Sequence, residues 1–313
     1  MPFFSVIIPL YNKEDYIAEC LESALNQSFN DYEIVIVNDG STDNSVQIVE
    51  RINSEKIRLF HQENQGASKA RNKAASLSKG QYLAFLDADD IWKPNHLESL
   101  NESITTFPNS GIYANNYFIK HSNTYTAPAE LNIKVNNNAP FILEDFFEAS
   151  LKETVVWTSA CSIEKSKFES YGMFNPIYLS SQDLDMWIRI ALKEPIVFHP
   201  KKTMIYNNSI ENSLGKIEDN DARFILLESF KEYEQSNCSL KAYLDLKRYG
   251  LALRTKINGE DKIYKDTLKT IDFENLNTKQ KILLGTPSFL LKLLNNIRPV
   301  IIKNSLYLRI FKS

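Results

Sequence analysis

The first ninety residues alternate between short apolar runs and amphipathic segments, and this alternation most constrains the fold. The apolar runs predict buried strands, and the segments between them predict helices. Strands are expected at 5–10, 32–38, 57–60 and 82–86, and helices at 13–27, from the turn at 39–43 to about 53, and at 67–77. This spacing is typical of a parallel, doubly wound sheet flanked by helices, so the chain is predicted to be an α/β protein.

Acidic residues follow two of these strands. Asp39 ends the second strand, and Asp87, Asp89 and Asp90 follow the fourth. Because ligands bind beyond the carboxyl ends of such strands, these side chains are expected to line one crevice. Three carboxylates this close repel one another unless a cation or hydrogen-bond donors offset their charge. Hard oxygen ligands favour Mg²⁺ or Mn²⁺, and the alternative is a solvated acidic turn before a helix near Pro94.

Composition and missing motifs argue against several classes of protein. The formal net charge of −3 gives no indication of nucleic-acid binding. The three cysteines are widely spaced and lack a C-x-x-C pattern, which argues against a disulfide framework or zinc site and fits a reducing cytoplasm. No secretory signal is recognised, and no apolar run approaches the roughly 18–20 residues that span a bilayer. Without a dinucleotide fingerprint or a P-loop, binding a diphosphate would require a metal.

Four short blocks occur in the order and spacing of the family 2 glycosyltransferases, which the chain resembles over residues 3–210. The blocks are Ser5–Asn12, Val37–Asp43, Asn64–Gly66 with Ala70–Asn72, and Leu86–Asp90. The resemblance implies the GT-A fold, a mostly parallel, Rossmann-like sheet flanked by helices. It also implies a nucleotide-sugar donor, usually a UDP-sugar, a Mn²⁺ or Mg²⁺ cofactor, and inversion of the anomeric centre.

The resemblance assigns the donor site to residues within these blocks. The residues so assigned are Pro9, Tyr11, Asp39, Arg71, Asp87, Ala88, Asp89 and Asp90. Asp89 is the expected metal ligand, and Asp39 matches the carboxylate that contacts the base. Asp87 is expected to contact the ribose or the metal's waters, and Asp90 is expected to bind the sugar or to orient the site. The alternatives are a turn or cap role for Asp39 and a surface salt bridge for Arg71.

The acceptor half is less regular. Residues 155–163 are expected to form a strand, and 171–176 resembles the family segment that precedes its general base. Asp183, at the start of the following helix, matches that base. Gln182 replaces the glutamate common before it, and Asp185 is the competing carboxylate. The simpler role for Asp183 is that of a helix cap.

A second departure from the family lies at Tyr206–Ser209. Many relatives have Tyr-Arg-x-His here, and the histidine sometimes helps to hold the metal or diphosphate. This chain has Tyr-Asn-Asn-Ser instead. The resemblance therefore leaves open how the metal and diphosphate would be clamped.

The expected organisation is a catalytic domain followed by a helical region. The domain spans 1–215, with a nucleotide-sugar half at 1–110 and an acceptor half at 111–215, and the helical region spans 216–313. From 275 to 313 there are seven basic residues and no acids, whereas 1–274 has 29 bases against 39 acids. The tail at 279–313, basic and amphipathic, is expected to lie on the cytoplasmic membrane surface. The alternative is packing against the main domain or against a second subunit in a homodimer.

The predicted function is metal-dependent transfer of a hexosyl or N-acetylhexosaminyl group to a hydroxyl of a glycan or lipid-linked glycan. Assembly of a bacterial surface polysaccharide is the expected setting. The rival is a non-catalytic nucleotide-sugar or glycan-binding module of the same fold. A nucleotidylyltransferase is disfavoured because Tyr11–Glu14 replaces the glycine-rich, basic loop of that class. The loop at 113–152 contains no recognisable code for the sugar, acceptor or linkage.

Overall fold

The computed structural model describes residues 1–135, 137–210 and 219–294. The chain divides into two compact units. Unit 1 comprises residues 1–129, 133–146 and 154–215, and unit 2 comprises residues 130–132, 147–153 and 216–313. Two short segments within the expected catalytic domain thus group with the helical region.

Unit 1 is built on one mixed sheet, whose main path runs β3-β2-β1-β4-β9-β6-β10-β5 in the described residues. Two further strands lie off this path: β7 pairs with β6, and β8 pairs with β10. The strands are β1 (Phe4–Leu10), β2 (Tyr32–Asp39), β3 (Ile57–Gln62), β4 (Tyr82–Phe85), β5 (Ile91–Trp92), β6 (Ile112–Ser122), β7 (Tyr125–Pro128), β8 (Phe141–Ile142), β9 (Cys161–Glu164) and β10 (Ile196–Asn207). β1 to β4 are mutually parallel, which confirms the predicted α/β pattern of the first ninety residues.

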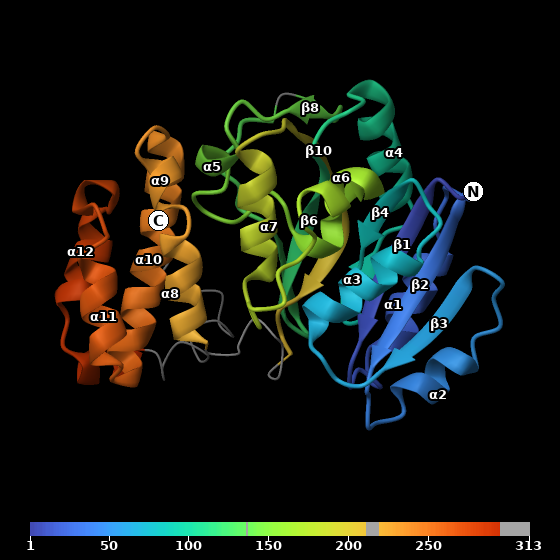
Figure 1. The fold of residues 1–313 in the computed structure, drawn as a ribbon, viewed down its shortest axis with the longest axis horizontal. Helices are drawn as coiled ribbons and strands as arrows, with labels where there is room; N and C mark the ends of the chain where they lie inside the picture. Colours follow the sequence, from blue (N-terminus) through green and yellow to red (C-terminus); the bar gives the residue numbers. More distant parts are fainter. Residues whose placement is uncertain (136, 211–218, 295–313) are drawn as a thin grey trace. The chain divides into compact units, whose positions relative to one another are not determined.

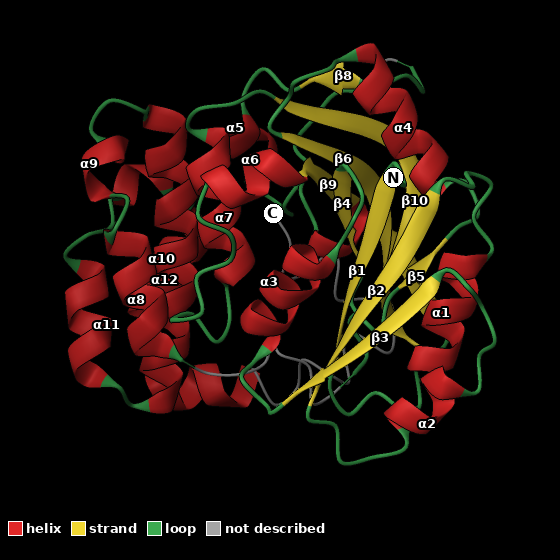
Figure 2. Cartoon of the chain, turned by 45° about the vertical axis from the view of Figure 1, so that its right-hand side comes forward, coloured by secondary structure: helices red, strands yellow, loops and turns green. Residues whose placement is uncertain are grey.

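Helices cover both faces of this sheet. Those of unit 1 are α1 (Ile17–Leu25), α2 (Ser45–Glu50), α3 (Ala67–Leu77), α4 (His96–Thr106), α6 (Lys165–Ser170) and α7 (Gln182–Ala191), whereas the short α5 (Phe146–Ala149) belongs mostly to unit 2. Figures 1 and 2 show α3, α6 and α7 on one face and α1 and α4 on the other. The core between them is aliphatic and aromatic, because both faces of the central strands are covered.

The strand order creates a switch point beside β1. The chain leaves β1 for β2 and β3 on one side, then returns to place β4 on the other side. The loops that leave the carboxyl ends of the parallel neighbours β1 and β4 therefore begin side by side, at the expected position of the crevice. Residues 11–14 and 87–90 form the beginnings of these two loops.

The prediction of a strand at 155–163 is wrong over most of that range. Only Cys161–Glu164 is a strand, and the 3-10 helix η1 (Thr158–Ala160) precedes it. Val155 and Val156 are buried outside the strand, so their apolar character reflects burial in an irregular segment. β9 pairs antiparallel with both β4 and β6 and so joins the two halves of the sheet.

Unit 2 is helical. Its elements are α8 (Asn220–Glu228), α9 (Lys231–Glu234), α10 (Cys238–Asn258), α11 (Asp261–Leu268), η3 (Phe273–Asn275) and α12 (Thr278–Gly285). α10 begins where the Asn237 side chain accepts the Leu240 N–H at 2.8 Å, and it ends at Gly259, whose φ is 82°. The fully buried Arg248 in α10 forms ion pairs with Glu228 at 3.0 Å and Glu234 at 2.7 Å. These pairs fasten α8 and α9 to α10.

Candidate active site

Hydrogen bonds join the loops after β1 and β2, and they involve residues of the first two sequence blocks. The Asn12 side chain accepts the Thr42 N–H at 2.8 Å, and the Asn12 N–H donates to Ser41 Oγ at 3.1 Å. The Lys13 N–H donates to Ser45 Oγ at 2.7 Å. These blocks therefore also hold two loops together at the carboxyl edge of the sheet.

Asp39 anchors the turn that follows β3. It is 3% exposed, and its carboxylate accepts hydrogen bonds from Gln62 Nε2 at 2.7 Å, the Gln65 N–H at 2.9 Å and the Gly66 N–H at 2.8 Å. The turn at 62–66 leads directly into α3, which contains Arg71. Asp39 thus has a structural role at the predicted base-binding position.

Two carboxylates after β4 each pair with a cation. Arg71 Nη2 lies 2.5 Å from Asp87 Oδ1, and Lys13 Nζ lies 2.5 Å from Asp89 Oδ2. Arg71 comes from α3 and Lys13 from the loop after β1, so the two cations approach from different elements. The predicted charge offset is therefore met by side chains of the protein.

Asp90 is the most buried member of this acidic cluster. It is 1% exposed, and the Asn207 N–H at the end of β10 donates to its Oδ1 at 2.9 Å. Burial raises the pKa of Asp90 well above its usual value, and the charges of Asp89 and Asp87 raise it further. Burial also raises the pKa of Asp89, although the charge of Lys13 opposes that shift. Within the cluster, Asp87 is thus paired with an arginine, Asp89 with a lysine, and Asp90 with a backbone N–H.

Arg71 is a buried component of the crevice. It is 3% exposed, and within the described residues its Nε and Nη1 atoms have no hydrogen-bond partner. Its guanidinium carbon lies 5.6 Å from the centroid of the Phe174 ring. The neighbouring Asn72 fixes Phe174 by donating to its carbonyl at 2.8 Å and accepting its N–H at 3.1 Å. The ion pair of Arg71 therefore lies in the crevice, and the surface salt bridge considered above is not formed.

The two acidic residues at the start of α7 have different environments. Asp185 is ion-paired with Arg189 at 2.7 Å, and its side chain is 8% exposed. Asp183 is partly exposed, and its Oδ1 accepts the Leu184 N–H at 2.8 Å. The capping position belongs to Ser181, so Asp183 is not the N-cap. Of the two carboxylates, Asp183 is the one available to an incoming group.

Trp157 and Tyr206 form an aromatic pair. The half-buried rings of Trp157 and Tyr206 have centroids 4.1 Å apart. Burial is the main cause of the raised pKa of the Tyr206 hydroxyl, and nearby carboxylates raise it further. Those carboxylates are Asp90, Asp89, Asp87 and Asp183. All four carboxylates thus act electrostatically on one hydroxyl, although they come from two distant parts of the sequence.

Ser159 bonds to the acidic cluster and to Trp92. Its Oγ accepts the Asp87 N–H at 3.0 Å, and its carbonyl accepts from Trp92 Nε1 at 2.6 Å. The irregular segment before β9 thus contributes to the site.

The remaining predicted donor residues differ in exposure. Tyr11 is 45% exposed at the end of β1, whereas Ala88 is 2% exposed. Pro9 is partly buried within β1, opposite Val37 of β2. Among these three, only Tyr11 offers a largely accessible side chain.

The residues present are compatible with a divalent cation on one carboxylate. Within the described residues there is no group of three or more His, Cys, Asp or Glu side chains suited to hold a metal. Mg²⁺ and Mn²⁺ can be held by one or two carboxylates, with phosphate oxygens and water completing the coordination. Asp89 supplies a hard oxygen at the switch point, so its chemistry and place fit such a cation.

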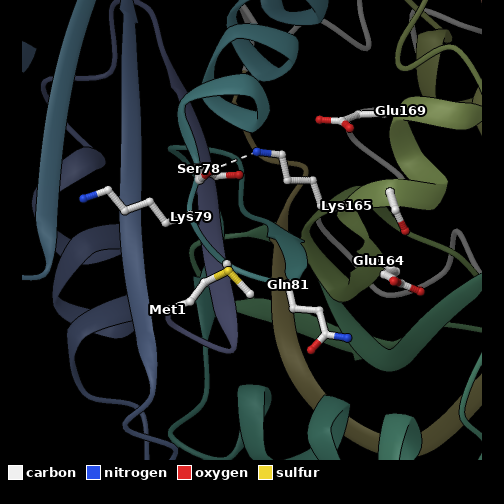
Figure 3. Close-up of a pocket in the computed structure, with 9 residues that line it drawn as sticks. Met1, Ser78, Lys79, Gln81, Glu164, Lys165 and Glu169 are labelled. Carbon is white, nitrogen blue, oxygen red and sulfur yellow. Dashed lines mark hydrogen bonds between the residues drawn. The ribbon is translucent and has the colours of Figure 1, made fainter.

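A separate hollow of about 620 Å³ lies at the opposite edge of the sheet. Figure 3 shows Met1, Gln81 and Glu164 around it, with Lys165 Nζ donating to the Ser78 carbonyl at 2.9 Å. Residues 1–3 and 78–81 precede β1 and β4, so this hollow adjoins the amino ends of those strands. The crevice with the acidic cluster is at their carboxyl ends.

Comparisons with known proteins identify the family and the fold. The family model for glycosyl transferase family 2 matches residues 5–172. An uncharacterized glycosyltransferase of Rickettsia felis is 32% identical over 200 residues, which cover 63% of this chain and 33% of that protein. Glycosyltransferase GlyG of Streptococcus pneumoniae is 38% identical over 117 residues, which cover 36% of this chain and 38% of GlyG. A chondroitin synthase of Pasteurella multocida is 41% identical over 100 residues, 31% of this chain and 10% of the synthase. The chain thus spans well under half the length of these relatives.

The structure resembles that of S. aureus TarS residues 1–349 in complex with UDP-GlcNAc. The TM-score is 0.68 at 19% identity, over 97% of this chain and 92% of the other. The likeness establishes the GT-A fold that the sequence resemblance implied. Since the family model also covers more than half of the chain, we conclude that this protein belongs to glycosyl transferase family 2.

Proposed function

We propose that the protein is an inverting glycosyltransferase that moves a sugar from a UDP-sugar to a hydroxyl of a glycan or lipid-linked glycan. The observation that carries this proposal is that Asp183 and the three carboxylates of the acidic cluster all raise the pKa of the same hydroxyl, that of Tyr206. An inverting transfer requires a base on one side of the anomeric carbon and charge stabilisation of the leaving group on the other. Relatives named as polysaccharide synthases support a carbohydrate acceptor.

In the proposed reaction, Asp183 removes the proton from the acceptor hydroxyl as its oxygen attacks the anomeric carbon. The bond from that carbon to the diphosphate breaks, and its electron pair remains on the diphosphate. Asp89 would hold Mn²⁺ or Mg²⁺, whose positive charge stabilises the departing diphosphate. Arg71 holds Asp87 in place through an ion pair. Its Nε and Nη1 atoms have no hydrogen-bond partner among the described residues. A positioned base contributes about 10²–10⁴-fold to the rate.

The proposal is tested by incubating the protein with Mn²⁺ and a panel of UDP-sugars, with and without lipid-linked acceptors. We expect one donor to release UDP faster than in buffer, and an acceptor to increase the rate. If UDP-sugars bind but none releases UDP above the buffer rate, the protein is the non-catalytic module.

Replacing Asp39 with alanine should lower both the free energy of unfolding and the affinity for UDP. The N–H groups of Gln65 and Gly66 lose their acceptor, and an unsatisfied buried group costs about 1–3 kcal/mol. Denaturant unfolding and calorimetric titration with UDP measure the two effects. Gln62→Ala is the control, since it removes one side-chain donor and leaves both backbone bonds. Lost stability with unchanged UDP affinity would limit Asp39 to its role in the turn.

We also propose that the carboxyl-terminal segment binds an anionic membrane surface. Exposed apolar side chains lie beside Lys279, Lys281 and Lys292. They are Ile282, Phe289, Leu290, Leu293 and Leu294. No helix in the described ranges has the length and apolar content to cross a bilayer, so insertion at the interface is the mode proposed. The tail from 295 to 313 lies outside the described residues.

Flotation with liposomes of anionic and of neutral lipid tests this placement. We expect the chain to float with anionic liposomes at low salt and less at high salt, since each basic residue contributes about 1 kcal/mol. Replacing Phe289 and Leu293 with serine should reduce binding, and Ile225→Ser, at an exposed position in α8, is the matched control. Negligible binding by the parent would contradict the membrane proposal, and dimeric elution would then favour a second subunit.

A further inference from the structure

The ion pair between Lys13 and Asp89 crosses the switch point of the sheet. Lys13 belongs to the loop after β1 and Asp89 to the loop after β4, 76 residues later. The two side chains are only 18% and 15% exposed. Such a pair is screened less than a surface salt bridge, so its charges interact more strongly.

The backbone of Lys13 is held by a contact that is independent of its ammonium group. The Lys13 N–H is held by Ser45 Oγ at 2.7 Å, a contact that does not depend on the side chain. The ammonium lies 2.5 Å from Asp89 and 5.9 Å from the centroid of the Tyr16 ring, at the end of a flexible four-carbon stem. Lys13 can therefore change partners without displacement of its loop.

We propose that Lys13 is the counter-ion of Asp89 before ligands bind, and that it exchanges this carboxylate for the diphosphate of the donor. This inference rests on the proposed function, because it assumes that Asp89 receives a divalent cation. While Lys13 is paired with Asp89, a cation alone must displace an ammonium to bind there. A diphosphate gives the displaced ammonium a new partner, and lysine binds phosphate as a point charge.

Charge balance favours this order of binding. The pairs Lys13–Asp89 and Arg71–Asp87 neutralise two carboxylates before ligands arrive. A divalent cation with a diphosphate adds little net charge to the site, whereas the cation alone adds two positive charges. The site is thus suited to a cation–nucleotide complex and poorly suited to the cation alone.

Calorimetric titration of Lys13→Met distinguishes the two roles of the lysine. We expect Mn²⁺ without nucleotide to bind this variant about tenfold more tightly than the parent, because a competing charge is gone. We expect UDP in saturating Mn²⁺ to bind it about tenfold more weakly, because the phosphate loses a cation. A residue with a merely structural role would not shift the two affinities in opposite directions.

Two control variants complete the experiment. Lys13→Arg keeps the charge and should shift both affinities less than Lys13→Met does. Lys269→Met removes a lysine whose side chain is 73% exposed in unit 2, and it should change neither affinity. If Mn²⁺ binds Lys13→Met and the parent equally and both still bind UDP, the proposed role of Lys13 is overturned and the proposed function is not. Failure of the parent to bind UDP in Mn²⁺ contradicts the proposed function and this inference together.

Discussion

Replacing Asp183 with asparagine is expected to lower kcat by about 10²–10⁴-fold while leaving the affinity for UDP nearly unchanged. The asparagine cannot accept the proton of the acceptor hydroxyl, whereas the proposed donor contacts lie on other elements. Initial rates of UDP release and calorimetric titration with UDP measure the two quantities. Such a split identifies a group that acts on the acceptor alone.

Asp185→Asn is the matched control, two residues along the same helix. Asp185 is ion-paired with Arg189, which also donates to the Met173 carbonyl at 2.8 Å. The control should therefore lose stability but keep most of its activity per folded molecule. If Asp183→Asn remains active and folded Asp185→Asn does not, the base is Asp185.

Asp89→Asn is expected to abolish measurable turnover and to weaken Mn²⁺-dependent binding of UDP. A neutral amide is a poorer ligand for a hard cation than a carboxylate is. Loss of an outer-shell partner typically costs a metal site about 10–100-fold in affinity, and loss of a direct ligand should cost at least as much. Calorimetric titration with UDP in Mn²⁺ and in chelator measures the metal-dependent part.

Asp266→Asn is the control for the loss of one carboxylate, because Asp266 pairs with Lys269 on the surface of unit 2. It should match the parent in both titrations. Equal Mn²⁺-dependent affinity for UDP in Asp89→Asn and in the parent would rule out Asp89 as the metal ligand.

The sequence predicts the first half of unit 1 well, because hydrophobic periodicity and turn residues agree there. β1 to β4 and α3 lie where the pattern indicates, with ends that differ by a few residues. The pattern of 155–163 predicts a strand that mostly does not form, because apolar, β-branched residues are typical of both a strand and a buried irregular segment. Tertiary contacts of Ser159, rather than local propensity, determine its path.

The candidate site was predicted in part. The sequence identifies the acidic residues by their position after strands, but it does not indicate their partners. Lys13 lies 76 residues from Asp89, and Asn207 lies 117 residues from Asp90. No local pattern links positions so distant, although Lys13 directly follows the first sequence block. Trp157 and Tyr206 were likewise named only as parts of longer segments, and their contact depends on how η1 and β10 meet.

The stereochemistry of transfer tests the central claim most directly. Once a UDP-α-sugar donor and an acceptor have been found, proton NMR of the product glycoside reports the configuration of the new glycosidic bond. A single displacement assisted by Asp183 predicts the β-anomer, and Asp183→Asn should form almost none. Initial formation of the α-anomer would contradict the account, because retention requires a different arrangement of catalytic groups.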